Sequence, residues 1–166
     1  ARRHTEEEEL RRVLPVVRDL AAAGVIVSTD TMRADVAARA LDHGASMVND
    51  VSGGQADPSM LRVVADAGVP VVLMHWRGHS AHMQESAEYG DVVDDVRREL
   101  LPRLDEAVEA GISRDRIALD PGLGFAKTGG VDKAHSDSFN LNFFGDGVAG
   151  GAGNLGYDGS FLSEDG

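Results

Sequence analysis

Residues 25–50, VIVSTDTMRADVAARALDHGASMVND, decide the fold of this chain. The apolar, β-branched run at 25–30 predicts a strand, and residues 46–50 predict another. Between them, residues 33–44 place apolar side chains at helical spacing and close on a glycine, as helices often do. A strand, a helix and a second strand in this order indicate a unit with two parallel strands.

The same alternation continues on both sides of this unit. A helix is predicted before it, where Thr5 and Glu8 form a capping-box pattern and Pro15 indicates a kink or a late start. After it, Asp57 and Pro58 are expected to supply the N-cap and first position of a further helix. The remaining predicted elements are a helix at 59–68, a strand at 69–75, a helix at 91–111 and a strand at 116–120.

Strands that alternate with helices predict an α/β fold with a buried parallel sheet, either doubly wound or closed into a (βα)8 barrel. The 166 residues, 42% of them hydrophobic, are enough for one domain with a core. No cysteine is present and no apolar run approaches the roughly 20 residues of a membrane span. Residues 1–10 are charged and do not begin with Met. We expect a cytoplasmic protein without a membrane partner.

The net charge of the chain is −12, and Lys127 and Lys133 are its only lysines. This balance opposes the general attraction to phosphates on which nucleic-acid binding depends. We expect no nucleic-acid partner, and an anionic substrate would have to be held by local groups.

Every predicted strand ends on polar residues, namely Asp30, Asn49 with Asp50, His75 and Asp120. Both candidate architectures place their active sites at the carboxyl ends of the strands. The alternative for each position is that Asp or Asn caps the helix that follows. Four polar strand ends out of four favour a common site.

Asp30, Asn49 and Asp120 would provide two carboxylates that accept hydrogen bonds and one amide that both donates and accepts. This set suits a flat heterocycle with several N–H donors and a carbonyl, such as a purine or a pterin. The glycines after Asp120 allow the backbone to approach a ligand closely.

Three histidines, His75, His79 and His82, share one segment and raise the question of a zinc site. Their spacing matches no common zinc pattern, so the segment is interpreted as the polar rim of an active site. Arg77 either meets an anion or is solvated, and Trp76 either stacks on a ligand or packs.

Residues 129–166 differ in composition, since they hold half of the 20 glycines and four of the five phenylalanines. No helix or strand period continues there, so this glycine-rich tail is left unassigned. A frameshift or a chimeric junction would produce so abrupt a change.

Four motifs resemble those of the dihydropteroate synthase family in order and spacing, over residues 6–128, with wording closest to actinobacterial members. They are STDTMRADVAARAL at 28–41, MVNDVSGG at 47–54, VVLMHWRG at 71–78 and LDPGLGFAKT at 119–128. The resemblance implies a TIM barrel, usually a homodimer, in folate biosynthesis. Such enzymes use Mg²⁺ to join p-aminobenzoate to 6-hydroxymethyl-7,8-dihydropterin diphosphate, release diphosphate, and are targets of sulfonamides.

By this resemblance, site residues can be assigned motif by motif. The pterin would be bound by Asp30, Asn49, Val51, Met74 and Asp120. Asp120 would also be the catalytic group, because its carboxylate stabilises a developing cation on the pterin. The aminobenzoate side would be formed by Gly124 and Phe125.

Several family motifs are not found, among them the Asn-bearing loop that binds the metal and the Arg-x-His pattern that grips diphosphate. The metal ligands are therefore unknown. Residues 1–128 are expected to form about four βα units of an incomplete pterin-binding TIM barrel that is inactive alone. The alternatives are a methyltetrahydrofolate-binding methyltransferase and a non-catalytic, truncated pterin-binding product.

Overall fold

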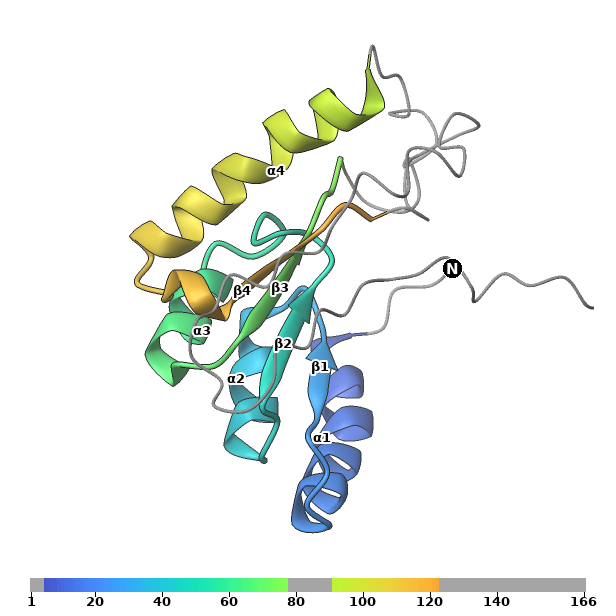
Figure 1. Cartoon of the computed structure of the whole chain (residues 1–166). Coiled ribbons are helices and arrows are strands. Elements are labelled where there is room, and N and C mark those ends of the chain that lie inside the picture. The colour runs from blue at the N-terminus through green and yellow to red at the C-terminus, as the bar shows by residue number, and fades with distance from the viewer. Residues whose placement is uncertain (1–4, 78–90, 123–166) are drawn as a thin grey trace, which may run out of the picture.

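The computed structural model describes residues 5–77 and 91–122, which form a four-stranded parallel sheet with helices (Figure 1). The strands are β1 (Ser28–Asp30), β2 (Met47–Asp50), β3 (Val71–Met74) and β4 (Ile117–Asp120). The helices are α1 (Glu6–Ala22), α2 (Ala34–Asp42), α3 (Met60–Ala67) and α4 (Val92–Glu109), with a 3₁₀ turn at η1 (Arg114–Arg116). No helix in this described part is both long and apolar enough to cross a membrane.

The order of the strands distinguishes the two architectures that the sequence left open. Each strand pairs with the next one along the chain, in the order β1-β2-β3-β4, without the reversal of a doubly wound sheet (Figure 1). Consecutive parallel strands whose helices cover one face are instead the arrangement of a (βα)8 barrel. The described residues therefore form a sector of such a barrel.

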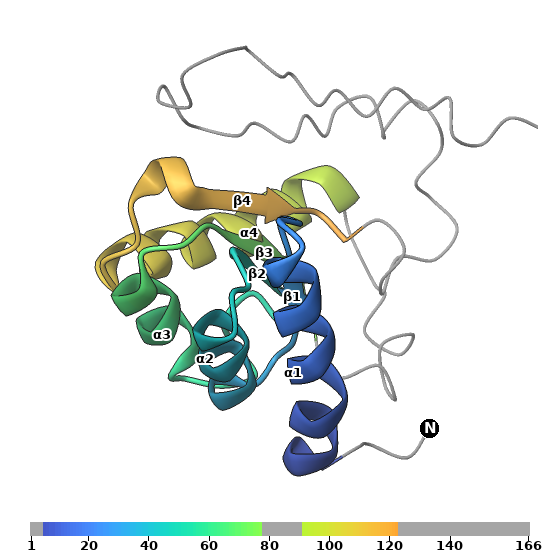
Figure 2. The same cartoon turned by 90° about the horizontal axis from the view of Figure 1, so that it is seen from below.

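The main apolar core of the described residues joins the helices to one face of the sheet. Figure 2 shows α2 and α3 side by side against the strands. The buried core residues are Ala34, Ala37, Val48, Met60, Val64, Val71, Leu73, Leu104, Ala107, Ile112 and Ile117. A smaller cluster around Val17 attaches α1 to α2 and to the approach to β1. Because burial of apolar surface is the main favourable term in folding, this face fixes how the strands are oriented.

The strand β1 is shorter than predicted, beginning at Ser28 instead of residue 25. The missing residues are used to end α1, because the Val25 N–H donates to the Leu20 carbonyl at 3.0 Å. Val25 and Ile26 are consequently exposed, Ile26 at 85%. The strand β1 can therefore begin only after the residues that close α1.

The two predicted helix starts had different outcomes. Thr5 is the N-cap of α1 and accepts a hydrogen bond from the Glu8 N–H at 3.2 Å, as predicted. Since α1 begins at Glu6, Pro15 lies inside the helix and does not mark its start. The prediction for α3 was wrong, because its N-cap is Ser59 and Pro58 precedes the helix.

Asp57 serves two segments instead of one helix. Its Oδ1 accepts from the Ser59 N–H at 3.0 Å, and its Oδ2 accepts from the Ala34 N–H at 2.8 Å. The carboxylate therefore caps the first turn of α2 from a loop 23 residues further along the chain. It joins the loop after β2 to the helix that precedes it.

Replacing Asp57 with alanine should lower the free energy of unfolding by about 1–2 kcal/mol, because the Ala34 N–H at the start of α2 loses its acceptor. Urea unfolding followed by circular dichroism measures this change. Asp105, exposed on α4, supplies the control, since Asp105→Ala removes a carboxylate that has no such role. Equal stability of the two variants would contradict the capping function.

Gly53 and Gly24 offer a second matched comparison, because both have positive φ, +61° and +79°. A Cβ on Gly53 would lie 2.7 Å from the Met74 carbonyl oxygen, whereas a Cβ on Gly24 would meet nothing within 4 Å. Both alanine variants should lose stability, and Gly53→Ala should lose a further 1–3 kcal/mol or so from overpacking. Thermal unfolding of the two proteins measures the difference, and a zero difference would show that the loop moves aside freely.

Candidate functional site

The face of the sheet opposite the helices carries the predicted site residues. Strand register pairs Asp30 of β1 with Asn49 of β2, and the row continues through Val72 and Ala118. Residues paired in parallel strands point to the same face. The neighbouring row, which includes Val48, is packed in the helix-covered core, so this row points away from the helices.

Asp120 lies on the same face, two residues closer to the carboxyl end than Ala118. Its register partner on β3 is Met74, which is 2% exposed. Since adjacent strands are about 4.8 Å apart, Asp120 lies about 10 Å across the sheet from the strand of Asn49. Val72, which is partly buried, and Met74, which is buried, lie between the two polar ends.

Asp30 and Asn49 form a polar pair at one end of this surface. Burial raises the pKa of the Asp30 carboxyl, the hydrogen bond with the Asn49 side chain lowers it, and the nearby Asp50 carboxylate raises it, with a net increase. The ionised form of Asp30 is therefore disfavoured in the folded protein. A bound N–H donor would compensate for this cost.

Asp120 has a structural role in the turn that follows its strand. Its Oδ1 accepts from the Gly122 N–H at 2.7 Å, which closes the turn after β4. Among the described residues this is the one hydrogen-bond donor to the carboxylate.

Asp50 is a structural residue, in contrast to its neighbour Asn49. It is fully buried on the helix side, and its carboxylate accepts hydrogen bonds from Ser52 and Gly54. Strand alternation explains the difference, because consecutive residues point to opposite faces. Asp50 therefore holds the turn directly after β2 and does not cap α3, whose N-cap is Ser59.

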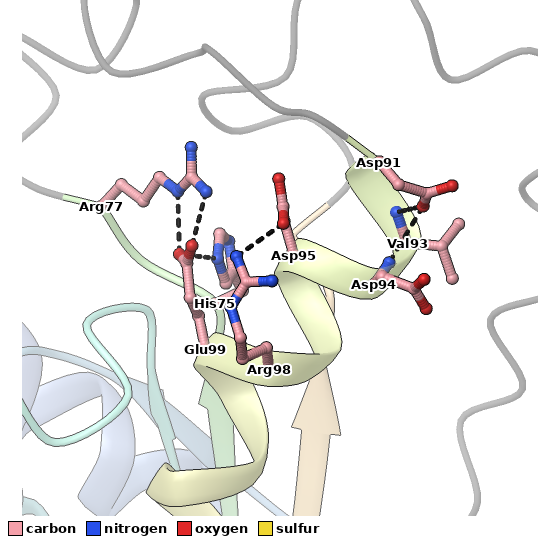
Figure 3. Close-up of polar contacts among 8 residues, drawn as sticks. All are labelled: His75, Arg77, Asp91, Val93, Asp94, Asp95, Arg98 and Glu99. Carbon is pink, nitrogen blue, oxygen red and sulfur yellow. Dashed lines mark hydrogen bonds and ion pairs between the residues drawn. The ribbon is translucent and has the colours of Figure 1, made fainter.

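His75 and Arg77 depart from the expectation of a polar rim. His75 is 3% exposed, and its Nε2 lies 2.9 Å from Glu99 Oε2 on α4 (Figure 3). Arg77 is not solvated, since its Nε donates to the same oxygen at 2.8 Å and its Nη2 donates to Glu99 Oε1. The reason is again alternation, which turns His75 toward the helices because Met74 faces the opposite side of the sheet. Trp76, the residue between His75 and Arg77, is partly buried.

Glu99 has the most altered acidity among the described residues. The hydrogen bond from Arg77 is the largest cause, and together with His75 it lowers the pKa of Glu99 to about 2 despite partial burial. No sequence signal pointed to Glu99, because it lies in mid-helix and meets its partners 22 and 24 residues away.

Glu9 lies in the acidic first turn of α1 and contacts the loop after β1. Its Oε1 accepts from the Thr31 hydroxyl at 2.8 Å. Its Oε2 pairs with Arg33. Glu9 therefore holds the loop directly after Asp30.

The other predicted site residues are only partly covered by the structure. Val51 is partly buried directly after β2. Gly124, Phe125, His79 and His82 lie outside the described residues. A cavity of about 280 Å³ lies at the opposite, amino-terminal ends of β3 and β4, away from the polar trio.

The resemblance implies Mg²⁺, which would need several acidic or histidine side chains placed close together. Within residues 5–77 and 91–122, no group of three or more His, Asp or Glu side chains is placed to hold a metal. The described residues therefore do not fit a metal site, and no catalytic step through a metal is derived from them.

Comparisons with known proteins agree with the fold and with the motifs. The sequence profile of the family described as pterin binding enzyme matches residues 1–138. A dihydropteroate synthase of Mycobacterium leprae is 58% identical over 122 residues, which are 73% of this chain and 43% of that protein.

Solved structures of Xanthomonas albilineans dihydropteroate synthase are also similar. The structure with 4-aminobenzoic acid has a TM-score of 0.70 at 43% identity, covering 77% of this chain and 45% of that one. The complex with 7,8-dihydropteroate has a TM-score of 0.67 at 42% identity, covering 75% and 44%. The chain thus spans less than half the length of these relatives. It belongs to the pterin-binding enzyme family, and about three quarters of it is a dihydropteroate synthase-like pterin-binding domain.

Proposed function

We propose that this chain supplies the pterin-binding part of a dihydropteroate synthase. The observation that carries the proposal is the common face of Asp30, Asn49 and Asp120, at the carboxyl ends of strands that match this family. The reaction is the condensation of 6-hydroxymethyl-7,8-dihydropterin diphosphate with p-aminobenzoate to give 7,8-dihydropteroate and diphosphate.

The pterin ring suits the distribution of polar and apolar groups on this face. Its amino-pyrimidinone edge carries N–H donors and a carbonyl, which complement carboxylate acceptors and the Asn49 amide. Its flat body would rest on Val72 and Met74, with Val51 at one side. Since a buried acceptor left unpaired costs roughly 1–3 kcal/mol, the polar set would select pterins over rings that lack these donors.

The chemical step follows from the position proposed for Asp120. The bond between the pterin methylene carbon and the diphosphate oxygen breaks, and diphosphate leaves with the electron pair. The Asp120 carboxylate stabilises the positive charge that develops on the ring. The aniline nitrogen of p-aminobenzoate then forms the new C–N bond and loses a proton, without a covalent enzyme intermediate. Gly124 and Phe125 are proposed for the aminobenzoate side.

We further propose that the chain binds pterin but does not turn it over alone, and that the complete enzyme is a homodimer that uses Mg²⁺. Two observations support the proposal that the chain binds pterin without turnover. The chain covers less than half of its relatives, and its described residues include no group of side chains placed to hold a metal. Diphosphate release from the purified chain, supplied with both substrates and Mg²⁺, tests it. Turnover that requires both substrates would show that the chain is sufficient.

Asp120→Asn should weaken pterin diphosphate binding about 10- to 100-fold, because it removes a charged acceptor worth roughly 1.5–3 kcal/mol. The fold should persist, since an Asn oxygen still accepts from the Gly122 N–H. Isothermal titration calorimetry measures the dissociation constant. Asp115→Asn makes the same change in η1, before the amino end of β4, and should leave the affinity as it is. Unchanged affinity in Asp120→Asn would refute the assignment.

Asp30→Asn should weaken pterin binding and yet stabilise the free protein at pH 7. A raised folded-state pKa means that the folded protein holds the Asp30 proton more tightly than the unfolded chain does. The wild-type protein therefore loses stability as the pH rises from the unfolded-state pKa of Asp30 through its higher folded-state pKa. The neutral amide of the variant does not titrate and avoids this loss. Urea unfolding at pH 7 measures the gain, which should vanish toward pH 3. A less stable variant at pH 7 would contradict the electrostatic account.

A further inference from the structure

Three side chains, Glu99, His75 and Arg77, form a contact between α4 and the end of β3, called here the Glu99 cluster (Figure 3). Both oxygens of the Glu99 carboxylate are used, Oε2 by His75 Nε2 and Arg77 Nε, and Oε1 by Arg77 Nη2. Arg77 thus presents two parallel N–H groups to one carboxylate, the most specific geometry for such a pair. The side chain of His75 is 2% exposed and that of Arg77 is 18% exposed. Burial makes this contact stronger than an ordinary surface ion pair.

The Glu99 cluster begins one residue after Met74, and the backbone there is enclosed on two further sides. The His75 N–H donates to the Asp120 carbonyl at 2.8 Å. A Cβ on Gly122 would lie 3.0 Å from Met74 Cγ, and one on Gly53 would lie 2.7 Å from the Met74 carbonyl oxygen. The turns after β2 and β4 therefore both press against Met74. The backbone of Met74 therefore has little room to move. The side chains of His75 and Arg77, which follow it, are the remaining groups that can shift its position.

We propose that Glu99 is a positioning residue for the pterin site: by holding His75 and Arg77 against α4, it sets the position of Met74 under the ring. The proposal rests on the proposed function, because it concerns the same pterin surface. Glu99 itself lies on the helix side of the sheet and does not touch the ligand. Its effect passes through His75, whose backbone joins Met74 to the strand that carries Asp120.

The competing explanation is that the Glu99 cluster merely attaches α4 to the sheet. The two differ in what happens to Met74 compared with the rest of the core. A positioning role moves Met74 alone, whereas a purely structural role also disturbs Met60, which is fully buried between the helices and the sheet. Methyl groups of methionine therefore make a direct probe, and the chain contains five methionines.

The test compares the full chain labelled with ¹³C-methyl methionine in wild type, Glu99→Gln and Glu109→Gln by NMR. Glu109→Gln makes the same chemical change at an exposed position of the same helix. In Glu99→Gln the Met74 methyl signal, assigned with Met74→Leu, should shift while the Met60 signal stays. The control should shift neither. Arg77→Lys, which keeps the charge but loses the paired N–H groups, should shift the Met74 signal in the same direction and serves if Glu99→Gln does not fold.

The second readout is the dissociation constant for 6-hydroxymethyl-7,8-dihydropterin diphosphate in the same proteins. Loss of an outer partner weakens metal sites about 10- to 100-fold, and about a tenfold rise is expected for Glu99→Gln. If the Met74 methyl signal of Glu99→Gln does not shift and its affinity is unchanged, the proposal is overturned. A shift of both the Met60 and the Met74 signals would also overturn it. If wild type binds no pterin, the proposed function fails, while the methyl signals still report whether Glu99 positions Met74.

Discussion

The in-register pairing of four parallel strands in chain order is the constraint on which the rest of this structure depends. It brings Asp30 beside Asn49 and Asp120 beside Met74, and it sends the alternate residues into the core under the helices. A shift by one residue in any strand would exchange the two faces, because side chains alternate along a strand. Candidate site and core are therefore specified together, and the apolar side chains that pack against the helices also decide which polar side chains lie on the opposite face of the sheet.

Carboxylates hold the loops that leave this sheet. Asp50, Asp57 and Asp120 accept backbone N–H groups in the turns after β2 and β4, while Glu9 and Glu99 reach from helices to the segments after β1 and β3. Each contact fixes a loop without occupying the open face. The chain is strongly acidic, and part of that charge serves this structural purpose. Asp30 is the exception, because the burial that raises its pKa is unfavourable for folding.

Sequence reasoning located the strands from short apolar runs and placed the polar residues at their ends, and the family comparisons confirm the recognition that followed. Its errors were local and have physical causes. The strand at residue 25 was predicted too long because Val25 is needed to close α1, and Asp57 was assigned to one helix although it caps another. His75 was expected at a polar rim but is buried against Glu99. In each case a contact with a distant segment outweighed the local signal.

The sequence by itself determined the succession of helices and strands, their parallel arrangement and the polar residues at the strand ends, because spacing and turn chemistry are written in neighbouring residues. Only the tertiary structure decided that the sheet is wound in one direction, that Asn49 faces the site while Asp50 caps a turn, and that Glu99 meets His75 and Arg77. These outcomes depend on register and on the packing of segments more than 20 residues apart. Such contacts form when the apolar core brings the segments together, and no local pattern encodes them.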